Sequence, residues 1–559
     1  MIAALLLATL PHIAPARAAD PVFEAMSAEL RRSFDRLKNA EKVPLYFLEY
    51  EVTDTIQYHV GASNGALAWE SDRSYERYLD VDLRVGARKL DNTHQFKGPP
   101  GGESQTYRGE RKIRIAIEDD VDSLKAAIWA ETDAAFKQAQ ERYTKVVTNH
   151  AVTAEAEDPS DDFGAPQPAV EATGTTVEPP PLDVPALRDR VRKLSLRFKG
   201  TPFIHASNVS FSMRSENRRV TTSEGRRVKM GQNFLRLAYS LETRTDDGMD
   251  LSRFMAYDGA RTEDFPSDER ILQDMERSIA ELKALREAPV VQPFSGPVIL
   301  KNRAAAVFFH EILGHRMERQ RQKNEFEGQT FAKKVGERIV SDIISVYDDP
   351  TLDRFNGVFL RGAYRFDDEA MPAKRVALVE NGVLKNFLMD RSPLQSFKES
   401  NGHGRREPGL PIVARMGNTI VQASKTMSYA RLRERLIEEI RRQGKPFGLL
   451  FEDIQGGFTT TVREGTQSFK VLPLLVYRVY PDGRPDEAVR GVNLVGTPLT
   501  SFAKIIAAAD DYDIFNGTCG AESGWVPVSG VAPSLLISEM EVEKQQKAEV
   551  KPPILPPPF

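Results

Sequence analysis

The sequence predicts an α+β protein built in two parts. We expect an N-terminal α/β domain of helices and a mixed sheet, followed by a mostly antiparallel C-terminal β domain, barrel-like or sandwich, that carries a buried helix. Helical and strand-like segments follow one another in the first half, whereas hairpin signals dominate the second. After Asn302 the side chains are almost all apolar until His310 and Glu311, which indicates the buried helix.

Length and composition limit the possible classes of protein. With 559 residues, of which 41% are hydrophobic, the chain is long enough for several domains and a large core. The net charge of −4 is close to neutral, and no long basic run stands beside an aromatic platform, so we expect no nucleic-acid partner. The single cysteine excludes an internal disulfide and leaves the redox compartment open.

Residues 1–18 have features of a signal peptide. The apolar run over residues 2–10 is too short to span a bilayer, and Ala16-Arg17-Ala18 has the small-x-small form of a signal-peptidase site. We therefore predict a periplasmic or secreted protein without a membrane span. Because the usual basic residues at the start are missing, a cytoplasmic location is the alternative.

Residues 19–290 form the predicted N-terminal domain. The spacing of apolar residues predicts helices over 23–37 and 119–147, and residues 44–52 and 75–90 are strand-like. The alternation LDVDLRV within the second of these strands predicts a sheet with one face in solvent.

The second half of this domain begins after an unusual insertion. Residues 155–184 combine proline, glycine, alanine and acidic residues with little periodicity, which predicts a disordered linker. A helix over 185–198, β segments through Tyr257 and a charged helix over 271–285 follow.

The predicted C-terminal domain covers residues 291–545. Its apolar stretches indicate strands, and Asn381-Gly382 between two of them is a hairpin signal. An amphipathic helix is predicted over 425–444, and the proline-rich residues 546–559 are predicted to be a disordered tail. Residues 316–329 are almost wholly polar, which is typical of a solvated helix or loop.

The buried helix ends in the pattern H-E-x-x-x-H, formed by His310, Glu311 and His315. On a regular α-helix, positions i and i+5 lie about 140° apart, so the two imidazoles cannot reach one ion. The helix must therefore unwind near its end, and Gly314 permits such a break. A buried imidazole and carboxylate need partners, and a metal ion with an activated water would satisfy both.

Catalytic zinc takes three protein ligands and keeps one position open. Cys519 lies in a glycine-rich loop, where backbone can approach a ligand closely. The soft donor set of His310, His315 and Cys519 favours Zn²⁺. Glu311 is then the expected general base, which takes a proton from the metal-bound water.

Several motifs resemble those of the TldD/PmbA family of metallopeptidases. They are HEILGH after PVIL, SNGHGRR at 400–406, and GTCG followed by VPV within 517–528, and the resemblance covers most of 295–542. It implies a TldD-type subunit that binds zinc through the two histidines and the cysteine and cleaves peptides or unfolded polypeptides with the motif glutamate. It also implies a homodimer, or a heterodimer with a PmbA-like paralogue, around an enclosed chamber.

Other interpretations stay open at this point. The two histidines are alternatively satisfied core or surface residues, and a lone buried cysteine is commonly a small hydrophobe. Cys519 is alternatively the nucleophile of a thiol hydrolase, with a motif histidine as its base. A third alternative is a non-catalytic, metal-stabilised subunit for peptide binding or maturation.

Five further residues are candidates for substrate binding. His403, Arg405 and Arg406 are candidates to orient a peptide or to pair with its carboxylate, and a structural surface loop is the alternative. Gly456 and Gly457 are candidates to expose backbone for pairing with an extended peptide, and a simple turn is the alternative.

Overall fold

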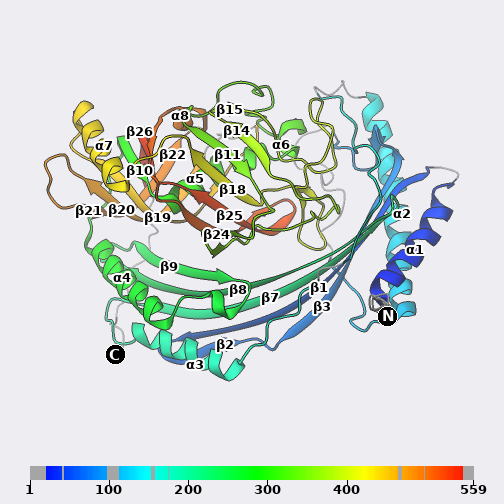
Figure 1. Cartoon of the computed structure of the whole chain (residues 1–559), viewed down its shortest axis with the longest axis horizontal. Coiled ribbons are helices and arrows are strands. Elements are labelled where there is room, and N and C mark those ends of the chain that lie inside the picture. Colours follow the sequence, from blue (N-terminus) through cyan, green and yellow to red (C-terminus); the bar gives the residue numbers. More distant parts are fainter. Residues whose placement is uncertain are drawn as a thin grey trace, which may run out of the picture.

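The computed structural model describes residues 20–40, 43–96, 112–152, 158–173, 176–463, 469–496, 498–545 and 555. The predicted signal peptide and nearly all of the predicted C-terminal tail lie outside these residues. Within them, no helix is both long and apolar enough to cross a membrane. The α+β class is confirmed: a curved N-terminal sheet with its helices lies beneath a β-rich C-terminal domain (Figure 1).

Nine strands form the N-terminal sheet, in the order β4-β3-β1-β7-β8-β6, with β2 beside β1, β5 beside β3 and β9 beside β8. The β6–β8 pair is parallel and the others are antiparallel, so the predicted mixed sheet is confirmed. The strands are β1 (Leu45–Ser63), β2 (Ala66–Glu70), β3 (Ser74–Ala87), β4 (Leu90–Asp91), β5 (Ile113–Arg114), β6 (Val170–Ala172), β7 (Ala206–Thr222), β8 (Arg226–Arg244) and β9 (Asp250–Gly259).

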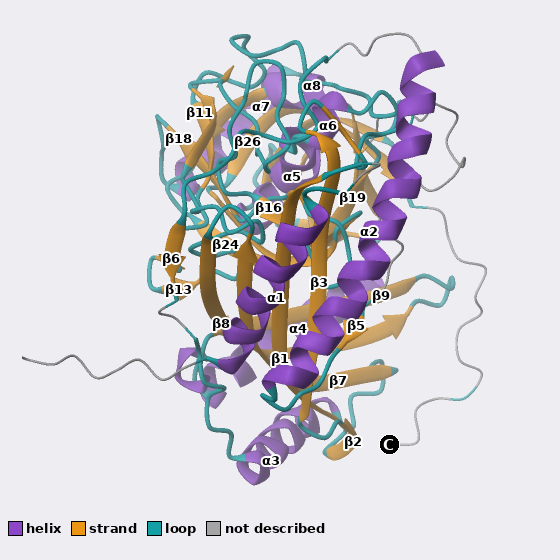
Figure 2. Cartoon of the chain, turned by 90° about the vertical axis from the view of Figure 1, so that its right-hand side faces the viewer, coloured by secondary structure: helices purple, strands orange, loops and turns teal. Residues whose placement is uncertain are grey.

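Helices cover one face of this sheet. α1 (Pro21–Leu37) and α2 (Val121–Val152) lie side by side over β1 and β3 (Figure 2). α3 (Val184–Ser195) packs on β1 and β7, and α4 (Asp268–Glu287) packs on β8 and β9. Because side chains alternate along a strand, Tyr50, Val52 and Val60 of β1 all point to this helical face, where they are buried.

On the opposite face of the sheet, the polar side chains of β1 and β3 beneath the C-terminal domain are also buried. Glu51 of β1 accepts a hydrogen bond from Arg406 at 2.7 Å, and Asp80 of β3 accepts one from the backbone N–H of Gly409 at 3.0 Å. Both acids are almost inaccessible because the C-terminal domain covers them. The prediction of a solvated face is therefore wrong, since ion-pairing partners replace water there.

The predicted disordered linker is packed where the structure describes it. The Phe163 ring is 1% exposed and lies between the guanidinium groups of Arg84 and Arg391, at 3.9 and 4.2 Å from its centroid. The backbone N–H of Gly164 donates to the carbonyl of Arg391 at 2.8 Å, and β6 extends the sheet. The prediction failed because a few specific contacts order a segment whose average composition is disorder-prone.

Five strands close into a barrel in the C-terminal domain, in the order β10-β19-β20-β22-β26 and back to β10. Phe294 at the start of β10 pairs with Val542 near the end of β26. β21 and β23 attach to this barrel. Its strands are β10 (Phe294–Leu300), β19 (Gly448–Thr459), β20 (Phe469–Val479), β21 (Glu487–Val489), β22 (Val492–Gly496), β23 (Ile505–Ala508) and β26 (Leu535–Lys544).

A six-stranded sheet, in the order β15-β14-β11-β18-β25-β24, forms the second layer of the C-terminal domain. The predicted hairpin is confirmed, since Asn381 and Gly382 adopt φ values of 47° and 83° between β14 and β15. The strands, with two short ribbons, are β11 (Ile344–Asp348), β12 (Arg354–Phe355), β13 (Val358–Phe359), β14 (Val376–Glu380), β15 (Val383–Leu384), β16 (Gly404–Arg405), β17 (Val413–Ala414), β18 (Asn418–Ala423), β24 (Asp513–Ala521) and β25 (Gly524–Ala532).

Helix α5 (Asn302–Ile312) packs between the barrel strand β19 and strands β24 and β25 of the second sheet. Phe308 and Phe309 are fully buried, as the apolar sequence predicts. Gly530 of β25 allows the close approach, because a Cβ there would lie 3.1 Å from the Cβ of Ala306. The remaining helices are α6 (Gln320–Lys323), α7 (Tyr429–Arg442), which packs on the barrel, and α8 (Pro498–Ala503), with 3₁₀ turns η1 (Leu196–Phe198), η2 (Thr262–Asp264) and η3 (Gly314–Met317).

Candidate metal centre

Helix α5 unwinds at the position that the motif spacing predicts. It ends at Ile312 and continues as the 3₁₀ turn η3 from Gly314. A Cβ on Gly314 would lie 2.0 Å from the sulfur of Met416, so only glycine fits against that side chain. The Arg316 guanidinium donates to the carbonyls of Glu311 and Ile312 at 3.1 and 3.2 Å, which satisfies the end of the helix.

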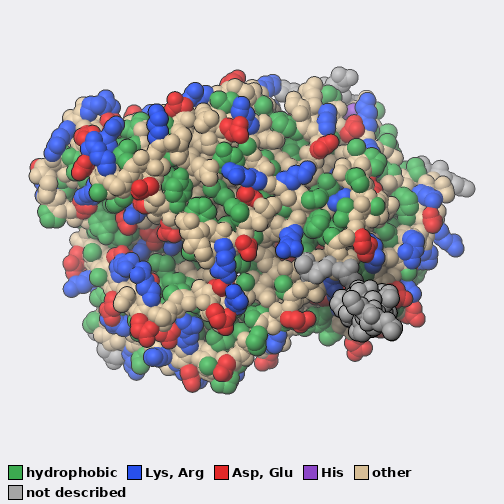
Figure 3. Space-filling model, in the orientation of Figure 1, with side chains coloured by type: hydrophobic (Ala, Val, Ile, Leu, Met, Phe, Trp, Pro, Cys, Tyr) green, Lys and Arg blue, Asp and Glu red, His purple; other side chains and the backbone are tan. Residues whose placement is uncertain are grey.

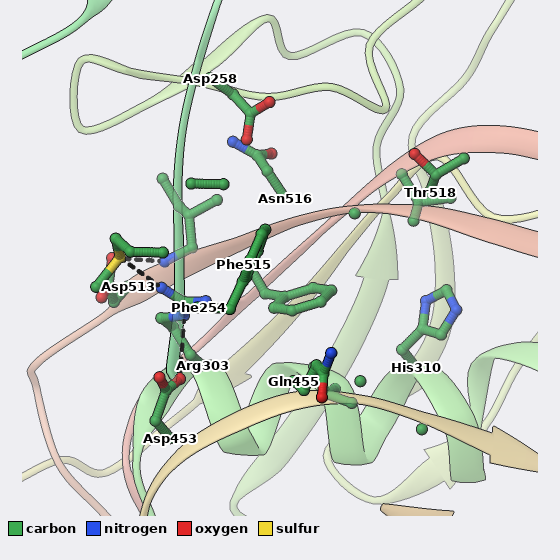
Figure 4. Close-up of a pocket in the computed structure, with 18 of the residues that line it drawn as sticks. Phe254, Asp258, Arg303, His310, Asp453, Gln455, Asp513, Phe515, Asn516 and Thr518 are labelled. Atoms are coloured by element: carbon green, nitrogen blue, oxygen red, sulfur yellow. Dashed lines mark hydrogen bonds and ion pairs between the residues drawn. The ribbon is translucent and has the colours of Figure 1, made fainter. Parts of the chain in front are cut away.

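The break brings both histidines to the same sulfur atom. Cys519 Sγ, on β24, lies 3.2 Å from His310 Nε2 and 3.3 Å from His315 Nε2. The three ligand atoms lie within 4.8 Å of one another, and this is the cluster that the described residues offer a metal ion. His315 and Cys519 are buried, whereas His310 is half-buried and stands between α5 and the strand that carries Thr518 (Figure 4).

These three groups strongly influence one another's ionisation. Burial opposes a charge on Cys519, but the neighbouring His315 and His310 outweigh it and hold the pKa of the thiol well below its usual value. Burial likewise opposes charge on the histidines, yet the thiolate raises the pKa of both. The cluster therefore stabilises a thiolate, which is the form of cysteine that binds metals.

Glu311 lies beside this cluster in the wall of a cleft. Burial raises the pKa of its carboxyl group, and the charges of His310 and His315 offset part of that effect. A carboxyl group in this environment exchanges a proton more readily near neutral pH than an exposed glutamate does.

Glu318 also belongs to the centre, although its role was not predicted from the sequence. Its Oε1 lies 3.1 Å from His315 Nδ1, and its side chain is completely buried. This contact leaves His315 Nε2 directed at Cys519. A carboxylate on the second nitrogen of a metal-binding histidine fixes the ring's orientation, and the spacing H-x-x-E was the signal available in the sequence.

The centre opens into a cleft of about 1230 Å³ between the two domains. Figure 3 shows the surface hollowed between the C-terminal domain above and the N-terminal sheet below. Arg303, Val307, His310 and Glu311, spaced along one face of α5, form part of its wall. Strands β9 and β24 also line it, and each pairs with a neighbour on one side only among the described strands.

The five candidate substrate-binding residues separate into two groups. Gly456 and Gly457 line the cleft. His403 does not: it is completely buried, with Nε2 3.2 Å from Asp348.

The two arginines are also structural. Arg405 donates to the carbonyls of Met416 and Pro527, at 2.6 and 2.7 Å. Arg406 pairs with Glu51 at the domain interface. All three residues of the 400–406 motif therefore have structural partners, and none of them lines the cleft beside the metal ligands.

Comparison with known proteins places this geometry in a family. Residues 294–544 match the model of the PmbA/TldA metallopeptidase C-terminal domain. The chain belongs to the TldD/PmbA family. The matched region contains both histidines, the cysteine and all five strands of the closed barrel.

Individual relatives agree with this family assignment. A protein of Methanothermobacter thermautotrophicus named metalloprotease is 28% identical over 67% of this chain and 78% of its own length. A Saccharolobus solfataricus protein named zinc metalloprotease TldD homolog is 24% identical over 44% of this chain and 51% of its own, and other relatives also match over about half of their length. The crystal structure of TldE from Thermococcus kodakarensis shares the fold, with a TM-score of 0.58 and 16% identity over 93% of this chain and all of its own.

Proposed function

We propose that this TldD/PmbA-family chain is a zinc-dependent peptidase that hydrolyses peptides or unfolded polypeptides. The observation that carries the proposal is the convergence of His310, His315 and Cys519 at the wall of a cleft, with Glu311 beside them. Two imidazoles and a thiolate with one position left open are a known donor set for catalytic zinc.

The distances from the sulfur to the two histidine nitrogens support zinc. A tetrahedral site with usual bond lengths separates sulfur from nitrogen by about 3.6 Å. The observed separations of 3.2 and 3.3 Å need to widen by only a few tenths of an ångström. His310, His315 and Cys519 would therefore hold the ion, and Glu318 would keep the His315 ring in place.

When bound, zinc supplies a Lewis acid that polarises a peptide carbonyl and makes water more acidic. Glu311 is the residue of this chain that would then move the proton. Its carboxylate takes a proton from the attacking water and gives it to the leaving amine. The raised pKa of this buried group suits both steps.

The cleft walls support an extended peptide as the substrate. Strands β9 and β24 line the cleft, and each has a strand neighbour on one side only among the described residues. Gly456 and Gly457 of β19 also lie in the cleft wall. An extended chain can add to such edges through main-chain hydrogen bonds, which requires that the substrate be unfolded locally.

The decisive experiment compares the wild type with Glu311→Gln. We expect the wild type to contain about one zinc per chain and to cleave an unfolded protein such as casein. The Gln variant should keep the metal and lose cleavage by at least about 100-fold, the usual contribution of a general base. Cleavage at the wild-type rate by this variant would contradict the proposal.

One specific observation favours a second candidate, a thiol hydrolase. Cys519 is held as a thiolate against two imidazoles, which is also the arrangement of an activated cysteine nucleophile. Alkylation of Cys519 should abolish activity in either case, but a chelator should abolish it only in a metallopeptidase. A metal-stabilised binding or maturation subunit would bind peptides and show no cleavage under any condition.

We further propose that the chain works in the periplasm or outside the cell, as a homodimer or with a PmbA-like paralogue. The sequence features of residues 1–18 support export, and the likeness to TldE supports a search for such a paralogue. Cell fractionation and light scattering of the purified protein, alone and mixed with the paralogue, test the two statements separately. Purely cytoplasmic protein or a monomer in both samples would contradict them.

A further inference from the structure

We propose that Arg415 is a positioning residue that holds Cys519 and His315 in the relative position needed for metal binding. Arg415 directly follows β17 and is completely buried. It does not line the cleft, yet one guanidinium group connects the two segments that carry these ligands. The inference rests on the metal site of the proposed function and adds the residue that assembles it.

On one side, Arg415 fixes the hairpin that carries the sulfur. Its Nη2 donates to the backbone carbonyl of Cys519 at 2.8 Å. Its Nη1 donates to Ser523 Oγ at 2.9 Å and to the carbonyl of Gly524 at 3.1 Å, in the turn between β24 and β25. One planar group therefore holds both the ligand residue and the adjacent turn.

On the other side, Arg415 reaches the residue that orients His315. Its Nε forms an ion pair with Glu318 Oε1 at 3.4 Å, and this same oxygen lies 3.1 Å from His315 Nδ1. Glu318 and Arg415 are both 0% exposed at the side chain. The chain of contacts runs from the Cys519 backbone through Arg415 and Glu318 to the imidazole.

Arginine suits this role for a geometric reason. The guanidinium group is a rigid fork with five N–H donors, so it can bind carbonyl groups at one end and a carboxylate at the other at the same time. Lysine offers a single point charge on a flexible stem and cannot fix both directions. Cys519 and His315 are 204 residues apart in sequence, so a buried cross-link of this kind decides where one ligand lies relative to the other.

The test measures metal affinity of the full chain rather than cleavage. The Zn²⁺ affinity, measured by competition with a chelator, should fall about 10- to 100-fold in both Arg415→Met and Arg415→Lys. This is the usual effect of losing a residue that hydrogen-bonds to a metal ligand. The visible and near-ultraviolet bands of the Co²⁺-loaded protein should shift, because the sulfur moves relative to the imidazoles. Arg391→Met is the matched control: Arg391 is equally buried but pairs with Glu224 at the domain interface, so its Zn²⁺ affinity and Co²⁺ spectrum should stay at wild-type values.

Two further variants keep the test decisive if the Arg415 variants fold poorly. Ser523→Ala removes one acceptor of Arg415 and leaves every charge in place, and it should weaken Zn²⁺ binding to a smaller, measurable extent. Glu318→Gln should also weaken binding. Because Arg415 acts partly through Glu318, the double variant should lose less affinity than the product of the two single losses.

The possible outcomes separate the two proposals. A wild-type protein that binds neither Zn²⁺ nor Co²⁺ would overturn the proposed function and this inference together. A wild type that binds zinc tightly, with folded Arg415 variants of the same affinity and the same Co²⁺ spectrum, would overturn the inference alone. Equal losses in the Arg415 and Arg391 variants would also overturn it, because the effect would then come from general loss of stability.

Discussion

Cys519 Sγ lies 3.2 Å from His310 Nε2, although 209 residues separate the two in the chain. The contact exists because β24 is an edge strand of the second sheet and α5 packs directly against it. The sulfur is thus placed by the tertiary fold, which makes its removal informative.

Replacing Cys519 by alanine should remove most of the bound zinc. Losing an outer-shell partner of a ligand already costs about 10- to 100-fold in affinity, so losing a ligand should cost more than that. Metal analysis after dialysis measures the effect. The control is Thr518→Ala, which changes the neighbouring residue on the same strand and should retain zinc. If Cys519→Ala binds as much zinc as the wild type, the three-ligand site is refuted.

Gly314→Ala should destabilise the protein, because the added methyl group would lie 2.0 Å from Met416 sulfur. Overpacking of this kind costs about 1 to 3 kcal/mol of unfolding free energy. Gly456→Ala is the matched control, since a Cβ added there would have no neighbour within 4 Å and stability should hardly change. Denaturant unfolding measures both, and adding Met416→Ala should recover part of the loss at Gly314.

Arg406→Met should lower stability without lowering zinc affinity. Arg406 is the buried partner of Glu51, and breaking a buried ion pair from one side costs about 3 to 5 kcal/mol. Removing the second charge as well, in a Glu51→Gln double variant, should restore part of this stability. If Arg406→Met folds normally but loses substrate affinity, Arg406 is a substrate-binding residue after all. Arg441→Met changes an exposed arginine and serves as the neutral reference.

Asp20 predicts a pH dependence of stability. Burial opposes its ionisation, but Lys229 and Arg219 outweigh burial and lower the pKa of this carboxyl group to about 2. Because the folded-state pKa lies below the unfolded value, the stabilisation is complete above about pH 5 and disappears as the pH falls towards 2.

The matched variant is Asp20→Asn, which keeps the side-chain oxygen that caps α1 at Phe23. The unfolding free energy of the wild type should exceed that of Asp20→Asn by about 1 kcal/mol at pH 7, after discounting for partial exposure. This difference should disappear by about pH 2 to 3. A gap that is independent of pH would show that the charge is not responsible.

The sequence predicted those parts of the site that follow from local geometry. The break at Gly314 was predictable because residues five apart never share a face of an α-helix. The hairpin at Asn381 and Gly382 was predictable because both residues tolerate positive φ.

Features that depend on distant partners were not predictable. The polar segment 316–329 was expected in solvent, yet Arg316, Glu318 and Gln320 are buried because partners from other elements satisfy them. Arg415 gave no signal at all, since nothing in its neighbourhood in the sequence points to Cys519. Charged residues look the same in a sequence whether water or a buried partner surrounds them.

The barrel closes where the domain begins and ends, because Phe294 pairs with Val542. A module whose first and last strands are hydrogen-bonded neighbours leaves and rejoins the rest of a polypeptide at a single place. It can therefore be joined to different preceding domains, or interrupted by an insertion at a surface turn, without rebuilding its own ring of strands. In such an arrangement evolution can change what reaches the cleft by altering the N-terminal sheet, while the C-terminal domain that carries the three ligand residues is inherited whole.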